Sequence, residues 1–94
     1  MIIIAGQLEL DPDERAEYLR RCGVATERAR SAPGCLDFVQ AADPIEPGRI
    51  NVFERWRSDE DLADFRAGDW EMEELPPLLS ASVAKYRVAS VEQP

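Results

Sequence analysis

A strand that runs directly into a capped helix constrains the fold of this chain more than any other feature. Between residues 49 and 65, apolar residues first alternate with polar ones and then repeat at helical spacing. The alternation has the period of two typical of a strand, and it sets Asn51 and Trp56 on opposite faces. Ser58 follows at an N-cap position with acids in the first turn, and Phe65 belongs to the apolar face of the helix. Because no loop separates them, the strand fixes how the helix lies against the sheet.

Four segments are predicted to be strands because hydrophobic side chains alternate along them. They span residues 2–10, 35–42, 50–56 and 83–91. In the second segment we expect Leu36 and Phe38 on one face and Cys35 and Asp37 on the other. Residues 43–48 are rich in turn formers, so the second and third strands are expected to form a hairpin.

Two helices are predicted to alternate with these strands. The first covers residues 12–31, where Asp11 and Glu14 can form a capping box and an apolar stripe recurs every three or four residues. The second begins after Ser58 and ends near Gly68, a residue type common just beyond helix ends. The resulting order of elements, β-α-β-β-α-β, is that of the ferredoxin-like α+β fold with a four-stranded antiparallel sheet.

Apolar residues occur on both faces of the first two strands, although two helices can cover only one face of a four-stranded sheet. The first strand illustrates this, with Ile2 and Ile4 on one face and Ile3 and Ala5 on the other. The uncovered face needs a second layer, and another copy of the same sheet is the simplest candidate. We therefore expect a homodimer formed through the sheet face.

The chain of 94 residues is expected to form one domain with a polar tail from about residue 92. Its net charge is −8 and Lys85 is its single lysine, which argues against binding to nucleic acid or to an anionic membrane surface. The apolar start at residues 2–5 is too short for a membrane span and lacks the basic region of a signal peptide. We expect a cytoplasmic protein.

Histidine is absent from the sequence, which excludes a zinc or haem site built on imidazole. The two cysteines, Cys22 and Cys35, have no metal-ligand spacing around them, and no histidine is present to activate either as a nucleophile. We interpret both as small packing residues in a reducing compartment. The chain is accordingly expected to hold no metal.

The chain resembles the antibiotic biosynthesis monooxygenase family over nearly its whole length. The resemblance rests on the opening strand at residues 2–6, on the turn at residues 32–35 (Ala-Pro-Gly-Cys), and on the strand end at residues 53–56 (Phe-Glu-Arg-Trp) before the second helix. It implies a dimeric α/β barrel with a pocket between sheet and helices, which some members use to oxygenate aromatic polyketides or quinols without metal or flavin. Other members degrade haem with the help of a histidine, and the position matching the histidine of many members is Phe65 here.

The resemblance also implies site residues. In the cofactor-free oxygenases an Asn and a Trp on the third strand hold the substrate oxyanion and the oxygen-derived group, and Asn51 and Trp56 match them by residue type. Asn51 is thus the candidate oxyanion donor, with the fixing of a neighbouring loop as the alternative. Trp56 is the candidate pocket wall and second donor, with a place in the core or dimer interface as the alternative. Phe38, Phe65 and Trp70 are the expected apolar lining.

Two further features have both a functional and a structural interpretation. Arg87 on the last strand is a candidate for pairing with an anionic substrate, and an ion pair with one of the chain's own acids is the alternative. The irregular apolar segment at residues 69–82 is interpreted either as a lid over the pocket or as an edge of the core or dimer contact.

Three functions remain open at this point. The first, implied chiefly by the resemblance, is a cofactor-independent monooxygenase that oxidises a small aromatic such as a phenol or quinol with O₂. The second is a non-catalytic or stress-related dimer that binds a small ligand. The third is an isomerase or cyclase of the same architecture that uses Glu54 or Asp37 to move a proton. Function depends on the site rather than on the fold, so the geometry of the site must decide among them.

Overall fold

The computed structural model describes residues 1–68 and 74–94 of the chain. The strands are β1 (Ile2–Glu9), β2 (Cys35–Ala42), β3 (Arg49–Trp56) and β4 (Ser80–Arg87). The helices are the short 3-10 turn η1 (Pro12–Glu14), α1 (Arg15–Ser31) and α2 (Asp59–Arg66). The predicted ferredoxin-like α+β fold is confirmed.

The four strands form one open antiparallel sheet in the order β2-β3-β1-β4. The eight residues of β1 pair with β3 on one edge without interruption, and with β4 on the other. Because pairing with β1 determines where β4 begins and ends, the last strand spans residues 80–87 instead of the predicted 83–91.

A β-bulge interrupts the pairing of β2 with β3 near the start of β2. Cys35 lies opposite Trp56, and the pairing then skips Leu36, which is the extra residue. The bulge shifts the alternation of side chains, so that Cys35 packs against the helix-side core together with Phe38. The expectation that Cys35 and Phe38 occupy opposite faces was wrong, because a period of two assumes regular pairing.

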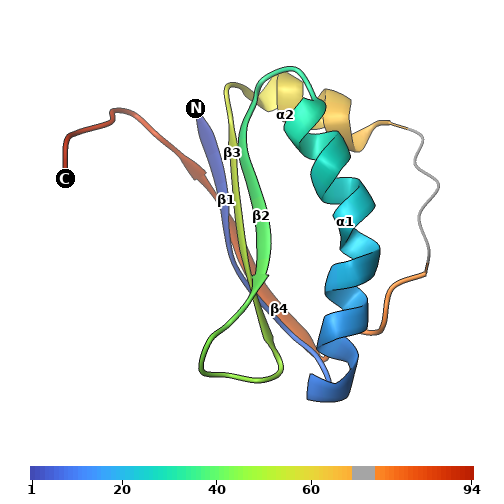
Figure 1. The fold of residues 1–94 in the computed structure, drawn as a ribbon. Coiled ribbons are helices and arrows are strands. Elements are labelled where there is room, and N and C mark those ends of the chain that lie inside the picture. The colour runs from blue at the N-terminus through green and yellow to red at the C-terminus, as the bar shows by residue number, and fades with distance from the viewer. Residues whose placement is uncertain (69–73) are drawn as a thin grey trace.

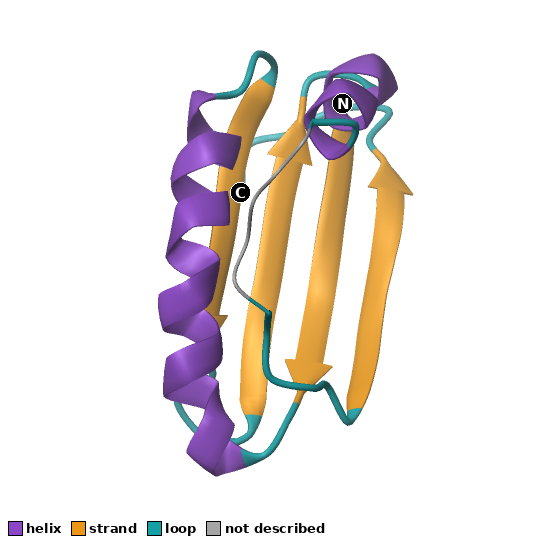
Figure 2. Cartoon of the chain, turned by 90° about the vertical axis from the view of Figure 1, so that its right-hand side faces the viewer, coloured by secondary structure: helices purple, strands orange, loops and turns teal. Residues whose placement is uncertain are grey.

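Both helices lie on the same side of the sheet (Figure 1). α1 runs along the sheet and packs mainly against β2, whereas α2 packs at the end of β3. Figure 2 shows the helix side of the sheet, with the strand farthest from α1 left uncovered. That strand is β4, whose residues are all exposed. No helix within residues 1–68 and 74–94 is long and apolar enough to cross a membrane.

Both capping residues predicted from the sequence act as helix caps, but Asp11 caps a different helix from the one expected. Ser58 caps α2 as predicted, and its Oγ accepts a hydrogen bond from the Asp61 amide at 3.2 Å. Asp11 caps η1 instead of α1, with its Oδ1 accepting from the Asp13 amide at 2.9 Å. The first turn is therefore a 3-10 turn, and the regular helix begins at Arg15.

The core between sheet and helices is divided into two clusters of buried side chains. The cluster beside α2 contains Ile2, Ile4, Ala29, Phe38, Trp56 and Leu62. The cluster beside the start of α1 contains Leu8, Leu10, Tyr18, Cys22, Ile50 and Val52. Gly6 lies between the two clusters along β1, where a side chain would collide with the backbone of Ser82 and Val83 on β4. The glycine therefore permits the close pairing of β1 with β4.

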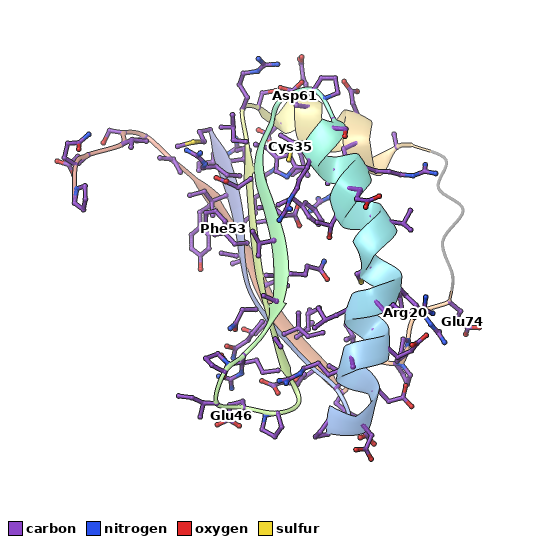
Figure 3. All side chains as sticks on the ribbon, viewed as in Figure 1. Arg20, Cys35, Glu46, Phe53, Asp61 and Glu74 are labelled. Carbon is purple, nitrogen blue, oxygen red and sulfur yellow. The ribbon has the colours of Figure 1, made fainter. Side chains whose placement is uncertain are left out.

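The sheet face away from the helices carries exposed apolar side chains. Val39 and Phe53 lie opposite each other on β2 and β3, and each is 39% exposed. Figure 3 shows Phe53 projecting on the side of the sheet opposite α1. Tyr86 on β4 is 53% exposed. No element of residues 1–68 or 74–94 covers this face, which therefore retains the unburied apolar surface expected from the sequence.

Candidate functional site

Three of the predicted site residues meet in one aromatic cluster between the sheet and α2. The Trp56 ring lies at a tilt on Phe65, with ring centroids 5.1 Å apart and an interplanar angle of 31°. Phe38 meets Phe65 edge to face, with centroids 6.1 Å apart. Trp56 and Phe38 are buried, whereas Phe65 is only partly buried. Phe65 is therefore the member of the aromatic cluster that reaches the surface while it contacts the buried rings.

The Trp56 side chain already has a polar partner. Its indole N–H donates to Glu54 Oε1 at 2.9 Å. The two residues share one face of β3, and the bond satisfies the sole polar atom of a fully buried ring. The N–H that was the candidate second donor to a substrate oxygen is thus occupied by the protein itself.

Asn51 lies on the other face of the sheet, away from the aromatic cluster. Because β3 pairs regularly with β1, Asn51 and Trp56 face opposite sides of one strand. The Asn51 Nδ2 donates to Asp43 Oδ1 at 2.8 Å, at the base of the β2–β3 hairpin. The other oxygen of Asp43 accepts from the Glu46 amide at 2.8 Å. One chain does not bring Asn51 and Trp56 together, and the observed contact of Asn51 is the loop-fixing one.

A cavity of about 570 Å³ opens between the C-terminal half of α1 and α2. Phe65 contributes to its wall, so the cavity adjoins the aromatic cluster. Its other lining residues are Glu27, Arg28, Ser31, Ala32, Pro33, Asp61, Asp64 and Gly68. Gly34, with a φ of 81°, turns the chain directly beside Asp61 and lets the end of α1 approach α2. The volume is in the range of small-molecule sites.

The charges around this cavity are mixed. Among the described lining residues, Arg28 is the cation and Glu27, Asp61 and Asp64 are the acids. Asp61 is engaged in the cap of α2, because its Oδ2 accepts from the Ser58 hydroxyl at 3.0 Å. Glu27 and Asp64 are exposed. The cavity thus offers an aromatic wall, a guanidinium that can balance an anion and carboxylates that can accept a proton.

Cys35 packs against the aromatic cluster as a thiol. Burial, followed by the nearby carboxylates of Glu54 and Asp37, raises the pKa of the Cys35 thiol. Its Sγ lies 3.6 Å from the Asp37 carbonyl oxygen, to which it donates weakly. A protonated thiol is a poor nucleophile and a poor metal ligand. Within residues 1–68 and 74–94, no three Cys, Asp or Glu side chains are grouped so as to hold a metal ion.

Arg87 lies apart from the aromatic cluster, at the β4 edge of the sheet. Its Nη1 is 2.5 Å from Asp59 Oδ2, and Lys85 pairs with the other oxygen of the same carboxylate. The observed contact of Arg87 is therefore the ion pair with one of the chain's own acids. Trp70 lies outside the described residues, and Met72 does as well. Leu75, from the same apolar segment, packs against the core cluster at the start of α1.

The contribution of α1 to the cavity wall was not predicted from the sequence. Arg28 is a charged residue of α1, and Ser31 is the last residue of that helix, so neither belongs to the apolar stripe predicted for residues 12–31. These positions become cavity walls because α2 packs beside them, which no periodicity within α1 reveals. The pairing of Trp56 with Glu54 had a partial signal, since the alternation puts both on one face of the strand.

Comparison with known proteins shows what this chain is similar to. Residues 1–69 match the family described as antibiotic biosynthesis monooxygenase. An uncharacterized protein of Synechocystis is 32% identical over 57 residues, which make up 61% of this chain and 39% of that protein. The match therefore spans about two fifths of the length of this relative.

Two solved structures show how well the fold is preserved. A proposed antibiotic biosynthesis monooxygenase from Deinococcus radiodurans superposes with a TM-score of 0.80 at 17% identity, over 99% of this chain and 97% of that one. A haem-degrading protein from Mycobacterium tuberculosis superposes with a TM-score of 0.69 at 20% identity, over 98% of each chain. Likeness at this level of identity establishes the fold, and the chemistry must be argued from the site residues.

Proposed function

The chain belongs to the antibiotic biosynthesis monooxygenase family, and on that premise we propose that it oxidises a small electron-rich aromatic with O₂. The substrate class is a phenol, a quinol or a polyketide-like ring. The observation that carries the proposal is the position of Phe65, which lines the cavity and also stacks on the buried Trp56. A ring entering the cavity would therefore meet an aromatic wall that the core holds in place.

The proposed reaction draws its electrons from the substrate. A deprotonated ring transfers one electron to O₂, and the two radicals combine in a C–O bond to give a hydroperoxide after protonation. Loss of water from the hydroperoxide leaves a carbonyl, so that a CH₂ group and O₂ yield C=O and H₂O. The part of the protein is to exclude water, to hold the reactants in contact and to stabilise the anion.

Arg28 is best suited to stabilise a substrate oxyanion, because it carries the guanidinium among the described residues that line the cavity. Glu27 or Asp64, which also line the cavity, would accept the proton that the substrate loses. Phe65 would hold the ring, and Trp56 would fix Phe65 from behind. In this assignment each residue acts from the helix side of the sheet.

The remaining residues proposed from the sequence are kept as separate hypotheses. Asn51 is still a predicted oxyanion donor, although its amide is bonded to Asp43 on the opposite face. Trp70 is still a predicted lining residue, and Phe38 supports Phe65 in the aromatic cluster. Mutation of Asn51 and of Arg28 in parallel distinguishes the two assignments of the oxyanion donor.

Haem does not fit the residues present. The sequence has no histidine, and Phe65 offers iron no donor atom. The indole N–H of Trp56 is held by Glu54, and burial raises the pKa of the neighbouring Cys35 thiol, which disfavours the thiolate that iron would need. Haem degradation is therefore not part of the proposal, although a haem-degrading protein shares the fold.

A second candidate function is a dimer that binds a small aromatic ligand without catalysis. Its support is that both donors expected to act in chemistry are already paired within the protein, Asn51 with Asp43 and Trp56 with Glu54. Such a protein would use the cavity and its aromatic wall for affinity alone.

Association of two chains through the uncovered sheet face is part of the proposal. Val39, Phe53 and Tyr86 leave an exposed apolar surface there, and burial against a second copy would remove it from water. The same pairing would close the two open sheets into the barrel that the sequence led us to expect. The expected cytoplasmic location stays a prediction, consistent with the free thiols Cys22 and Cys35.

Oxygen consumption by the purified protein tests the proposed function. Anthrone-like phenols and quinols are offered in the presence of a metal chelator, and we expect uptake that survives the chelator. Phe65→Ala and Arg28→Gln should each lower the rate by about tenfold or more, because the ring and its anion lose their contacts. Val24→Ala, on a residue of α1 that is 49% exposed, is the matched control and should keep the wild-type rate.

Each alternative has its own result. A rate of oxygen uptake that falls in Asn51→Ala but not in Arg28→Gln would identify Asn51 as the donor to the substrate oxyanion. Saturable binding of these aromatics without oxygen uptake would support the binding dimer. Turnover that needs no oxygen and has a bell-shaped pH profile, abolished in Glu54→Gln, would identify the isomerase.

A further inference from the structure

A second cavity, of about 480 Å³, lies between α2 and β4. It is lined by Asp59, Leu62, Ala63, Arg66, Ala67 and Lys85. The residues of α2 in this lining differ from those beside the aromatic cluster, where Asp61, Asp64 and Phe65 contribute. The two cavities therefore lie against different sides of the same helix.

Cations gather at the α2–β4 cavity although the chain as a whole has a net charge of −8. Arg66, in the last turn of α2, and Lys85 both line it. Arg87 lies two residues beyond Lys85 on the same face of β4 and pairs with Asp59 at its rim. Two cations thus line the cavity and a third pairs with Asp59, which is the single carboxylate among the described lining residues. The local charge is positive in an acidic protein.

The pairing of Asp59 indicates the kind of group that these cations bind. Arg87 Nη1 lies 2.5 Å from Asp59 Oδ2, and Lys85 pairs with Oδ1. Arg87 first and Lys85 second lower the pKa of Asp59 from 3.8 to about 2. Lys85 of the cavity lining is therefore placed where it pairs with a carboxylate, and Arg66 adds a guanidinium to the same lining.

We propose that the α2–β4 cavity binds a small organic carboxylate. The carboxylate would lie beside Lys85 and Arg66, and its apolar body would lie against Leu62, Ala63 and Ala67. The apolar part of the lining favours an organic anion over inorganic phosphate, because phosphate has nothing to bury there. This site is independent of the oxidation proposed for the other cavity.

NMR titration of ¹⁵N-labelled protein with three probes separates the contribution of the ligand's charge to binding from that of its ring. Benzoate carries both the charge and the ring, benzamide keeps the ring without the charge, and orthophosphate keeps charge without the ring. We expect saturable shifts of α2 and β4 amides with benzoate. Binding of each of the other two probes should be about tenfold weaker.

Variants of the charged residues give the site a distinctive signature. Lys85→Gln and Arg66→Gln should each weaken benzoate binding about fivefold, because each removes a cation from the cavity wall. Asp59→Asn should tighten it instead, because the carboxylate that competes for Lys85 and Arg87 is removed. Arg20→Gln is the matched control, since it removes a cation on α1 whose side chain is 61% exposed, and binding should not change.

Several results would overturn the proposal. Equal affinity for benzoate and benzamide would show apolar binding alone, and equal weakening in Arg20→Gln and Lys85→Gln would show unspecific attraction of anions. Tighter binding of orthophosphate than of benzoate would contradict an organic ligand. Absence of saturable benzoate binding in both wild type and Asp59→Asn would show that the cavity binds no carboxylate.

The design of the test covers two further points. Arg66 is exposed, so Arg66→Gln is expected to fold even if Lys85→Gln does not. The titration involves neither O₂ nor an oxidisable ring, so its outcome is separate from that of the proposed oxidation.

Discussion

The indole N–H of Trp56 donates to Glu54 Oε1 at 2.9 Å, and this bond joins two side chains on the helix-covered face of β3. The Trp56 ring that it holds is fully buried and lies against Phe65 in the cavity wall. Glu54 thereby orients the wall of a cavity that it does not itself line. The same bond takes up the N–H that a substrate oxygen would otherwise use.

The Glu54–Trp56 bond should be measurable as a coupling free energy. Glu54→Ala is expected to lower the free energy of unfolding by about 1 kcal/mol, because the buried indole N–H loses its acceptor. Trp56→Phe should cost about 2 kcal/mol, because it removes both the donor and buried volume. Urea unfolding of the two single variants and the double variant gives the coupling between them. Losses that simply add would show that the bond contributes nothing to stability.

Gly6 should not tolerate any side chain. A Cβ at Gly6 would overlap the backbone of Ser82 and Val83, so Gly6→Ala is expected to lower the free energy of unfolding by about 3 kcal/mol. Gly23→Ala is the matched control, because a Cβ at this position of α1 meets nothing within 4 Å. It should raise stability by about 0.5–1 kcal/mol. A Gly6→Ala protein as stable as wild type in thermal unfolding would contradict the close approach of β4.

Acid should weaken the β2–β3 hairpin by protonating Asp43. The Glu46 amide, then the Asn51 side chain and then the Ile45 amide lower the pKa of Asp43 from 3.8 to about 2. Since this pKa is depressed in the folded state, the stabilising contribution of the Asp43 carboxylate is complete at pH values above the ordinary pKa of 3.8. The contribution is lost as the pH falls through about 2. NMR titration of the Asp43 carboxyl carbon measures the shift directly.

The same titration tests the structural role of Asn51. Asn51→Ala should raise the pKa of Asp43, because the carboxylate loses the donor at 2.8 Å. Gln7→Ala is the matched control, since Gln7 is paired with Asn51 across the β1–β3 ladder and should leave the pKa of Asp43 unchanged. An unaltered Asp43 pKa in Asn51→Ala would show that the amide does not hold the hairpin.

Phe53→Glu should prevent association through the uncovered sheet face. Phe53 is 39% exposed and lies opposite Val39, so a carboxylate there would have to be buried without a partner in any sheet-to-sheet dimer. We expect wild type to sediment as a dimer and Phe53→Glu as a folded monomer, with circular dichroism reporting the fold. Ile45→Glu, at a residue of the hairpin that is 83% exposed, is the control and should remain dimeric. If Phe53→Glu sedimented like wild type, the interface would have to lie elsewhere.

The part of the site that could be predicted from the sequence is the part built by neighbouring segments. Trp56 and Phe65 meet because a strand leads into a capped helix without a loop, which leaves little freedom in how the two side chains are placed. The wall contributed by Arg28 comes from a helix far away in the sequence, and its solvent-side position gave no sign of the contact. Asn51 was identified by residue type alone, and residue type does not determine the partner of an amide.

The sequence by itself determined the order of elements, the cap of α2 at Ser58 and the apolar character of both sheet faces. These follow from alternation, capping and burial, which act between residues that are near one another along the chain. Only the tertiary structure decided the bulge at Leu36, the bounds of β4 and the pairing of Arg87 with Asp59. In a chain with 19 acids and 11 cations, composition allows many ion pairs, and a pair between residues far apart in the sequence forms only where packing brings their segments within reach.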